Sequence, residues 1–348
     1  MFFLYFIFHI LIQVSMLLCK KTIDIYLKEL GVDSEVSRII LLNNSRNFCF
    51  KVYLKQKDGF FLKQVKNNST ESIKLFQRES IFYTFVEKNN IASVRRLLPN
   101  FLGYDSLFNI AIWDLISNGI SLKKYLLKKE ITSSITSKIG NILKEYSEIQ
   151  LSKEMPFEPL YNPFFIDISQ SHNILKDNIF MDYIFNNEIL IEGYEKVKKM
   201  WCINSIVHTD IKFENFLIHQ KTSHIYLTDW EGASLGDINW DIACCLRNIT
   251  LEILSKEKIV LINSYTPLNP ILDNNILMKS LKAFLQSCEM EFDETRKTKL
   301  ICFFAVATID KLLEVAGAEN HLNKRDTQLI LLAESLLKTP SLYFKIWD

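Results

Sequence analysis

Three polar side chains at fixed spacing, His208, Asp210 and Asn215, carry the clearest chemistry in this sequence. They form the pattern His-x-Asp-x-x-x-x-Asn, in which the aspartate accepts a hydroxyl proton and the asparagine holds magnesium. Asp229 follows the apolar run 225–228, where phosphoryl-transfer enzymes place the carboxylate that binds the magnesium ion on the nucleotide phosphates. The pattern therefore predicts a site for a metal ion and phosphate groups.

The segment between Asn215 and Asp229 suggests how these two side chains would meet. Residues 216–218 and 225–228 have the composition of short strands, and 221–223 that of a turn, so a β-hairpin is predicted. A hairpin brings its two ends together. One amide oxygen, one carboxylate and the substrate phosphates then make a sufficient set of magnesium ligands.

An ordinary polar loop is the alternative interpretation. In that case His208 is a hydrogen-bonded core histidine and Asp210 is a turn residue. Either residue alone would fit this description, but the ordered set of four favours phosphoryl transfer.

Three consecutive segments, 208–215, 228–233 and 236–243, resemble the motifs of the aminoglycoside phosphotransferase and choline kinase-like enzymes. These are small-molecule kinases with the protein kinase-like fold. The Gly-Asp…Asp-Ile-Ala block at 236–243 separates them from protein kinases, whose Asp-Phe-Gly and Ala-Pro-Glu tripeptides do not occur in this sequence. Lys212, two residues after Asp210, is instead typical of protein kinases.

The resemblance implies ATP as co-substrate, Mg²⁺, and transfer of the γ-phosphate to a hydroxyl group of a small molecule. The acceptor would be an aminoglycoside, a choline-like amine, a sugar or an amino acid. A protein kinase, or a nucleotide-binding pseudokinase with a regulatory or scaffolding role, stays open as the alternative. The residues to which the resemblance assigns roles are Asp210 and His208 (catalysis), Asp241 (bracing of the catalytic loop), Asn215 and Asp229 (metal) and Glu231 (acceptor).

The same resemblance implies an α+β, two-lobed protein kinase-like fold. A small antiparallel β-sheet at 20–116 would form the N-lobe that covers the nucleotide, and a mostly α-helical C-lobe at 117–348 would carry the catalytic loop and the acceptor site. The chain has 348 residues, 48% of them hydrophobic, which is enough for a large core. Its 41 basic and 40 acidic residues argue against nucleic acid as a partner.

The seven cysteines are odd in number, lie in apolar surroundings and form no Cys-x-x-Cys pair. Such a pattern predicts reduced, buried thiols of a cytosolic enzyme and no zinc site. The sequence leaves the oligomeric state open.

Residues 1–19 form a hydrophobic N-terminal segment, almost continuously apolar over 2–18 and followed by Lys20 and Lys21. The apolar run is borderline for a membrane span. Two interpretations stay open: a membrane anchor, which would be the only contact with a membrane, or a mis-assigned start with translation beginning at Met16. Both predict a cytoplasmic catalytic body. If the segment spans a membrane, the two lysines on its C-terminal side would keep the body in the cytosol.

The N-lobe prediction consists of a helix at 22–30 and strands at 36–42, 47–54 and 60–65. The turn at 43–46 lies where the resemblance places the loop that covers the phosphates. It contains no glycine, so Asn44 and Ser45 are the candidate nucleotide-binding residues, and asparagine tolerates the left-handed backbone that such a loop requires.

Lys63 is predicted to be a buried cation, because strand alternation puts it on the same face as Phe61 and Val65. A helix predicted at 71–88 carries Glu79. A strand lysine paired with a helix glutamate grips the α- and β-phosphates in kinases. The alternative is an edge lysine whose side chain reaches water.

Two further strands are predicted at 94–105 and 109–115. They lead to a connection at 114–117, where Asp114 and Ile116 are expected to meet the adenine edge. Ser121 is expected to cap a helix that ends at 129. The remaining predictions are an irregular, proline-containing stretch at 153–180 and helices at 131–151, 181–201, 241–254, 274–286, 293–316 and 325–338.

Overall fold

The computed structural model describes residues 17–42, 46–67, 69–161, 163, 183–256, 271–319 and 323–348. The chain forms two compact units. The first extends to Ile120 and takes in Leu217–Gly232, and the second comprises Ser121–Phe216 and Ala233–Asp348. This division differs from the predicted lobes, because 217–232 had been placed with the C-lobe. Backbone hydrogen bonds from Leu227 to Leu97 and from Gln220 to Asn118 tie that segment to the first unit.

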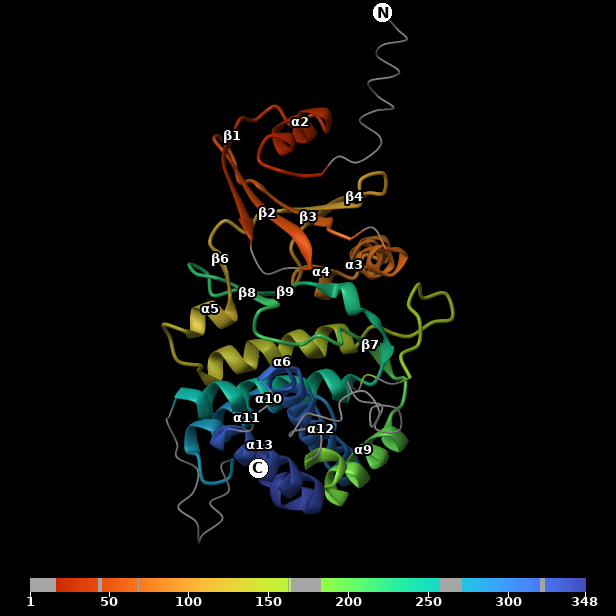
Figure 1. Cartoon of the computed structure of the whole chain (residues 1–348), viewed down its shortest axis with the longest axis vertical. Helices are drawn as coiled ribbons and strands as arrows, with labels where there is room; N and C mark the ends of the chain where they lie inside the picture. Colours follow the sequence, from red (N-terminus) through yellow and green to blue (C-terminus); the bar gives the residue numbers. More distant parts are fainter. Residues whose placement is uncertain are drawn as a thin grey trace, which may run out of the picture. The chain divides into compact units, whose positions relative to one another are not determined.

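The first unit is built on an antiparallel sheet of five strands with the order β1-β2-β3-β5-β4. Figure 1 shows β1, β2 and β3 side by side. The strands predicted at 36–42, 47–54, 60–65 and 109–115 agree with the structure in type and nearly in length. The strands and the helix before them are α2 (Thr22–Glu29), β1 (Val36–Leu42), β2 (Asn47–Leu54), β3 (Phe60–Val65), β4 (Phe101–Asp105) and β5 (Ile110–Asp114).

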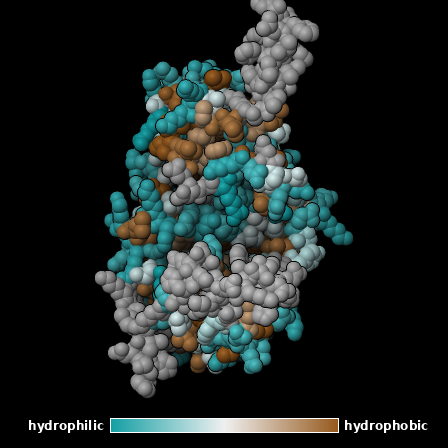
Figure 2. All heavy atoms as spheres, viewed as in Figure 1, coloured by the Kyte–Doolittle hydropathy of each residue, from teal (hydrophilic) through white to brown (hydrophobic). Residues whose placement is uncertain are grey.

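Alternating side chains of the central strands make the core of this unit. Phe50, Val52 and Leu62 are almost fully buried and pack with Ile23 and Leu27 of α2. Burial of such side chains stabilises the sheet by roughly 1.5–3 kcal/mol each. Figure 2 shows that further hydrophobic residues gather at the surface over the strands of this unit.

The predicted strand at 94–105 is wrong in its first half. Ala92–Arg95 forms the short helix α4, and β4 begins only at Phe101. The buried side chains Val94 and Leu97 are three residues apart, which is the spacing of a helical turn rather than of a strand. The amide of Leu97 accordingly donates to the carbonyl of Val94.

Helix α3 (Thr70–Lys88) begins at Ser69, whose side chain accepts a hydrogen bond from the amide of Ser72, and such caps contribute about 0.5–2 kcal/mol. The predicted hairpin is present as β8 (Phe216–His219) and β9 (Ile225–Leu227). With β6 (Gly119–Ser121) these strands make a sheet of order β6-β8-β9. The short helix η1 (Trp230–Gly232) follows at once.

The second unit is mostly helical, with one two-stranded sheet. Its core is the middle of α12, where residues 300–309 are almost all fully buried. The elements are α5 (Leu122–Leu126), α6 (Ser133–Ser147), α9 (Glu188–Met200), β7 (Ser205–Val207), β10 (Ser234–Gly236), α10 (Ile238–Lys256), α11 (Asn275–Ser287), α12 (Glu294–Glu319), α13 (Lys324–Lys338) and η2 (Pro340–Ile346).

The predicted helices of this unit are present with shifted ends. Ser121 caps α5 as expected, since its side chain accepts from the amide of Lys124, but the helix stops at Leu126 rather than 129. Helix α10 starts at Ile238, so Asp241 lies within its first turn instead of heading it. Most of the stretch 153–180 lies outside the described residues.

The five-stranded antiparallel sheet of one unit and the helices of the other confirm the α+β class. All seven cysteines are free thiols, and five are buried. The expectation of burial is wrong for Cys19 and Cys202, which are exposed. In the part of the chain that the structure describes, no helix is both long and apolar enough to cross a membrane, and residues 1–16 of the hydrophobic N-terminal segment lie outside that part.

Candidate functional site

The first unit gathers four of the predicted site residues around the ammonium group of Lys63. Its Nζ lies 2.8 Å from Glu79 Oε2, 2.5 Å from Asp229 Oδ1 and 3.2 Å from Glu231 Oε2. The Lys63 side chain is only 6% exposed and that of Glu79 4%. The predicted strand lysine and helix glutamate therefore form a buried ion pair, and the alternative of an edge lysine reaching water is wrong.

This cluster holds more negative than positive charge. Burial by itself would lower the pKa of Lys63, but the carboxylates of Glu79 and Asp229 outweigh it and hold that pKa well above its usual value. Burial raises the pKa of Glu79 to about 7, against the opposing effect of Lys63. The Lys63 shift thus comes from the surrounding carboxylates, whereas the Glu79 shift comes first from burial and is increased by the charge of Asp229. The cluster is thus an attractive place for a cation.

Trp230 fixes the two carboxylates that follow β9. Its ring stacks on Phe82 of α3 with a centroid distance of 3.7 Å and an angle of 9° between the planes. Asp229 and Glu231, on either side of Trp230, are thereby held against the helix that carries Glu79. Asp229 has a φ of 69°, a left-handed conformation that costs free energy for a residue with a side chain and is found at functional sites.

Glu231, which is predicted to face the acceptor, contacts two basic side chains of the first unit. In the first unit it contacts Lys63, and its Oε1 lies 3.9 Å from Nη1 of Arg46. Arg46 ends the β1–β2 turn and is 85% exposed. Asn44 and Ser45, the predicted residues of that turn, lie outside the described residues.

The connection after β5 includes the two residues predicted to meet the adenine edge, Asp114 and Ile116. The amide of Asp114 donates to Asn100, and the carbonyl of Ile116 accepts from Gly119. By contrast, the amide of Ile116 has no partner among the residues that the structure describes. A side chain at Gly119 would come within 2.7 Å of the Ile116 side chain, so this tight turn requires glycine. The Ile116 amide is the group that could donate to an adenine edge.

The second unit holds the predicted catalytic loop on the carboxylate of Asp241. Its Oδ2 accepts a 2.6 Å hydrogen bond from the amide of His208, and its Oδ1 a 3.1 Å bond from the amide of Thr209. The hydroxyl of Tyr146 donates to Oδ2 at 2.8 Å. Burial raises the pKa of Asp241, while the charge and hydrogen bonds of His208 oppose the shift. The loop backbone, with Thr209 at a φ of 68°, is therefore fastened to α10.

His208 is fully buried, and its Nδ1 accepts a 3.3 Å hydrogen bond from the amide of Asp210. Asp210 itself is 43% exposed. Its Oδ2 lies 2.5 Å from Lys212 Nζ and accepts from Asn215 Nδ2 at 3.2 Å. Since the amide nitrogen of Asn215 is directed at Asp210, the amide oxygen is the atom suited to a metal ion. Asn215 and Asp229 belong to different compact units, so their joint metal binding stays a prediction.

Sequence reasoning missed three residues that hold this loop. Tyr146 contacts Asp241, as described above. The buried guanidinium of Arg247 donates to the carbonyl of Ile211 at 2.9 Å, and Asn248 Nδ2 donates to the same oxygen at 2.9 Å. The sequence signal was weak: an arginine and an asparagine in the third turn of a helix that carries other polar residues as well.

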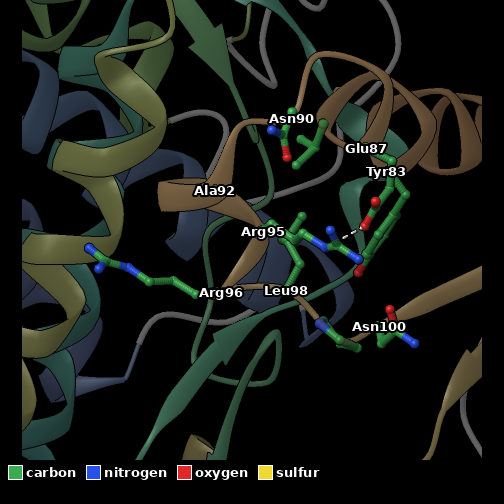
Figure 3. A pocket seen from close by; sticks show the side chains of 10 residues that line it. Tyr83, Glu87, Asn90, Ala92, Arg95, Arg96, Leu98 and Asn100 are labelled. Atoms are coloured by element: carbon green, nitrogen blue, oxygen red, sulfur yellow. Dashed lines mark ion pairs between the residues drawn. The ribbon is translucent and has the colours of Figure 1, made fainter.

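A pocket of about 340 Å³ in the first unit lies at the end of α3 and contains none of the predicted site residues. Figure 3 shows Arg95 turned toward Glu87 in this pocket, and the two side chains form a 2.8 Å ion pair. Tyr83 lines it from α3, one helical turn after Glu79. The pocket therefore shares no residue with the cluster around Lys63.

Residues 50–266 match the phosphotransferase enzyme family, so the chain belongs to this family of enzymes. The predicted family is confirmed. No curated protein sequence matches the chain.

Solved structures with the same fold share little sequence with this chain. An ethanolamine kinase from Plasmodium vivax has a TM-score of 0.56 at 15% identity, over 91% of this chain and 85% of that one. The GDP complex of wild-type aminoglycoside 2′-phosphotransferase-IIIa has 0.53 at 14%, over 92% and 97%. A choline/ethanolamine kinase family protein from Mesorhizobium loti has 0.51 at 14%, over 89% and 91%. The likeness establishes the protein kinase-like fold.

Proposed function

We propose that the protein is an ATP-dependent phosphotransferase that moves the γ-phosphate to a hydroxyl group of a small molecule. The observation that carries this proposal is the state of Asp210. Its carboxylate is partly exposed, while the backbone on both sides is fixed by Asp241 and by Asn248. A carboxylate that is accessible and rigidly held is suited to orient a hydroxyl group.

In the proposed reaction the acceptor hydroxyl oxygen forms a bond to the γ-phosphorus, and the bond from that phosphorus to the bridging oxygen of ADP breaks. Asp210 accepts the hydroxyl proton. Because such transition states are loose, orientation by Asp210 contributes along with its basicity. Lys212, paired with Asp210 in the free protein, is placed to move its charge to the transferred phosphate.

The Lys63 cluster supports nucleotide binding in the first unit. Its ammonium group is fixed by Glu79 on α3, so that it would contact the α- and β-phosphates without a large loss of side-chain entropy. Asp114 and Ile116 would bind the adenine, with the Ile116 amide as donor. The related aminoglycoside 2′-phosphotransferase-IIIa has been solved with GDP, which supports a purine nucleotide as donor and leaves ATP as part of the proposal.

The donor set fits magnesium. Asp229 supplies a carboxylate that is 31% exposed, Asn215 supplies an amide oxygen, and both are hard ligands of the kind magnesium takes together with phosphates and water. The surplus of carboxylates around Lys63 would be relieved by a cation. When bound, the ion would neutralise charge on the phosphates during transfer.

A protein acceptor is the second candidate, favoured by the Lys212 and Asp210 ion pair, since a lysine at this position is typical of protein kinases.

The test is a screen of purified protein with Mg-ATP against a library of hydroxyl-bearing metabolites and against protein substrates, with ATP consumption and phosphorylated products as readouts. We expect transfer to a small molecule that is lost in Asp210→Asn. Equal transfer by wild type and Asp210→Asn would refute the mechanism. Nucleotide binding without transfer to any acceptor would identify a pseudokinase.

A further inference from the structure

The second unit contains a pocket of about 280 Å³ next to the catalytic loop. Its walls come from α5, α10, α12, α13 and the loop itself. Lys212 lines the pocket, and its Nζ lies 2.5 Å from the carboxylate of Asp210. Asn248 lines it too and holds the carbonyl of Ile211. A molecule with its hydroxyl group at Asp210 would therefore have its remaining groups within reach of this pocket.

Basic side chains dominate the polar lining. Lys123, Lys212, Lys311 and Arg325 face three acidic residues, Glu214, Glu252 and Asp326. Counting side-chain charges gives four positive and three negative. The excess of positive charge is small. Which charges can act on a ligand therefore depends on the ion pairs and hydrogen bonds that each side chain already makes within the protein.

Two of the three acidic residues are already satisfied by the protein. Glu252 is 5% exposed and accepts from both Lys123, at 3.2 Å, and Lys256, at 3.0 Å. Asp326 is 9% exposed and accepts from the amide of Asn323 in the capping box of α13. Neither carboxylate is therefore available to attract a cationic ligand.

The basic residues of α12 and α13 are engaged more weakly. Lys311 pairs at 2.8 Å with Glu314, whose side chain is 61% exposed, and such surface pairs contribute only about 0–1 kcal/mol. The guanidinium of Arg325 makes one long contact, 3.5 Å from Nη2 to the Leu251 carbonyl, and no carboxylate pairs with it in the part of the chain that the structure describes. Its planar donors match a carboxylate or a phosphate group.

We propose that this pocket binds an anionic group of the acceptor, a carboxylate or a phosphate, and that Arg325 determines this specificity. The inference rests on the proposed function, because that function places the acceptor hydroxyl at Asp210. Acceptors such as hydroxy acids or phosphorylated alcohols fit this lining. An acceptor whose only charge is an ammonium group could pair with Glu214, the one lining carboxylate without a partner among the described residues, but it would leave Arg325 without an anion.

The first measurement needs no turnover. Inorganic phosphate and glycolate are titrated separately into the full-length protein, with Mg²⁺ and a non-hydrolysable ATP analogue present so that the nucleotide-phosphate site is filled. Wild type should bind at least one anion, and the tighter one identifies the group as phosphate or carboxylate. Arg325→Gln should weaken that binding about tenfold or more, with Arg325→Lys in between. Lys338→Gln, an exposed lysine at the far end of α13, is the matched control and should bind as wild type does.

Neither anion binding, or equal binding by wild type and Arg325→Gln, would overturn the inference. With an acidic acceptor, Arg325→Gln should raise the acceptor KM about tenfold and leave kcat and the KM for ATP nearly unchanged. Transfer to an amine alcohol with the same KM in wild type and Arg325→Gln would also overturn it, while the proposed function would stand. Anion binding that depends on Arg325 supports the inference even if no acceptor is phosphorylated, a result that refutes only the proposed function.

Discussion

The two compact units place charge around their functional side chains in opposite ways. In the first unit a single buried ammonium group is shared by three carboxylates, whereas in the second the accessible carboxylate of Asp210 lies next to a pocket lined by Lys311 and Arg325, two weakly engaged basic residues. An excess of carboxylates attracts magnesium, and available basic groups attract an anion. If both proposals hold, the charge of each unit is adjusted to a different ligand.

The largest effect should come from Asp210→Asn, which keeps the shape of the side chain and removes its charge. Turnover with the true acceptor should fall about 10²–10⁴-fold, the usual contribution of a general base. Mg-ATP affinity should change little, because the proposed metal ligands are untouched. Single-turnover transfer and nucleotide binding, measured side by side, check both statements. A parallel loss of transfer and nucleotide affinity would break the distinction between the two units.

A second substitution tests the carboxylate surplus of the first unit. Asp229→Asn should weaken Mg-ATP binding about 10- to 100-fold, because an interaction with a charged ligand is lost, and should weaken ATP binding in EDTA far less. Calorimetry with and without magnesium measures the difference. Asp33→Asn, at an exposed site between α2 and β1, is the control. Equal loss with and without magnesium would show that Asp229 serves the fold and not the metal.

Tyr146→Phe sharpens the role of the fixed loop in the second unit. It removes the 2.8 Å hydrogen bond to Asp241 Oδ2, which should lower the free energy of unfolding by about 1–3 kcal/mol. We expect turnover to fall severalfold with an unchanged KM for ATP. Thermal unfolding and steady-state kinetics test this, with Tyr125→Phe on α5 as the control. A stability loss without any change in kcat would mean that the loop does not need this anchor.

The smallest effect concerns pH and Glu79. The pKa of Glu79 is raised from the ordinary 4.5 to about 7 in the folded protein. Protonation of Glu79 therefore stabilises the folded state fully below pH 4.5, and this stabilisation is lost as the pH rises through about 7. Wild type should therefore lose stability between about pH 4.5 and 7.5 relative to Glu79→Gln, which cannot titrate. The midpoints of thermal unfolding across that range measure the difference, and Glu71→Gln, exposed on the same helix, should behave as wild type. A difference of the opposite sign would show that Lys63 keeps Glu79 ionised.

Local sequence patterns were sufficient where interactions between residues close in the chain decide the structure. Strand alternation located β1, β2 and β3, and a serine before an apolar helix located the cap at Ser121. Alternation also predicted that Lys63 is buried. The prediction failed at 94–100, where the buried Val94 and Leu97 have the spacing of a helical turn and not of a strand.

The sequence by itself determined the family and the order of its motifs, and it predicted which residues would act on phosphate, since these depend on residue type and spacing. Only the tertiary structure decided which distant groups meet. Glu231 joins Asp229 and Glu79 around Lys63, Trp230 stacks on Phe82, and Arg325 lines a pocket together with Lys212. Most of these contacts join residues that are more than a hundred positions apart in the chain. Their contacts arise from packing between distant elements, and no local periodicity encodes such packing.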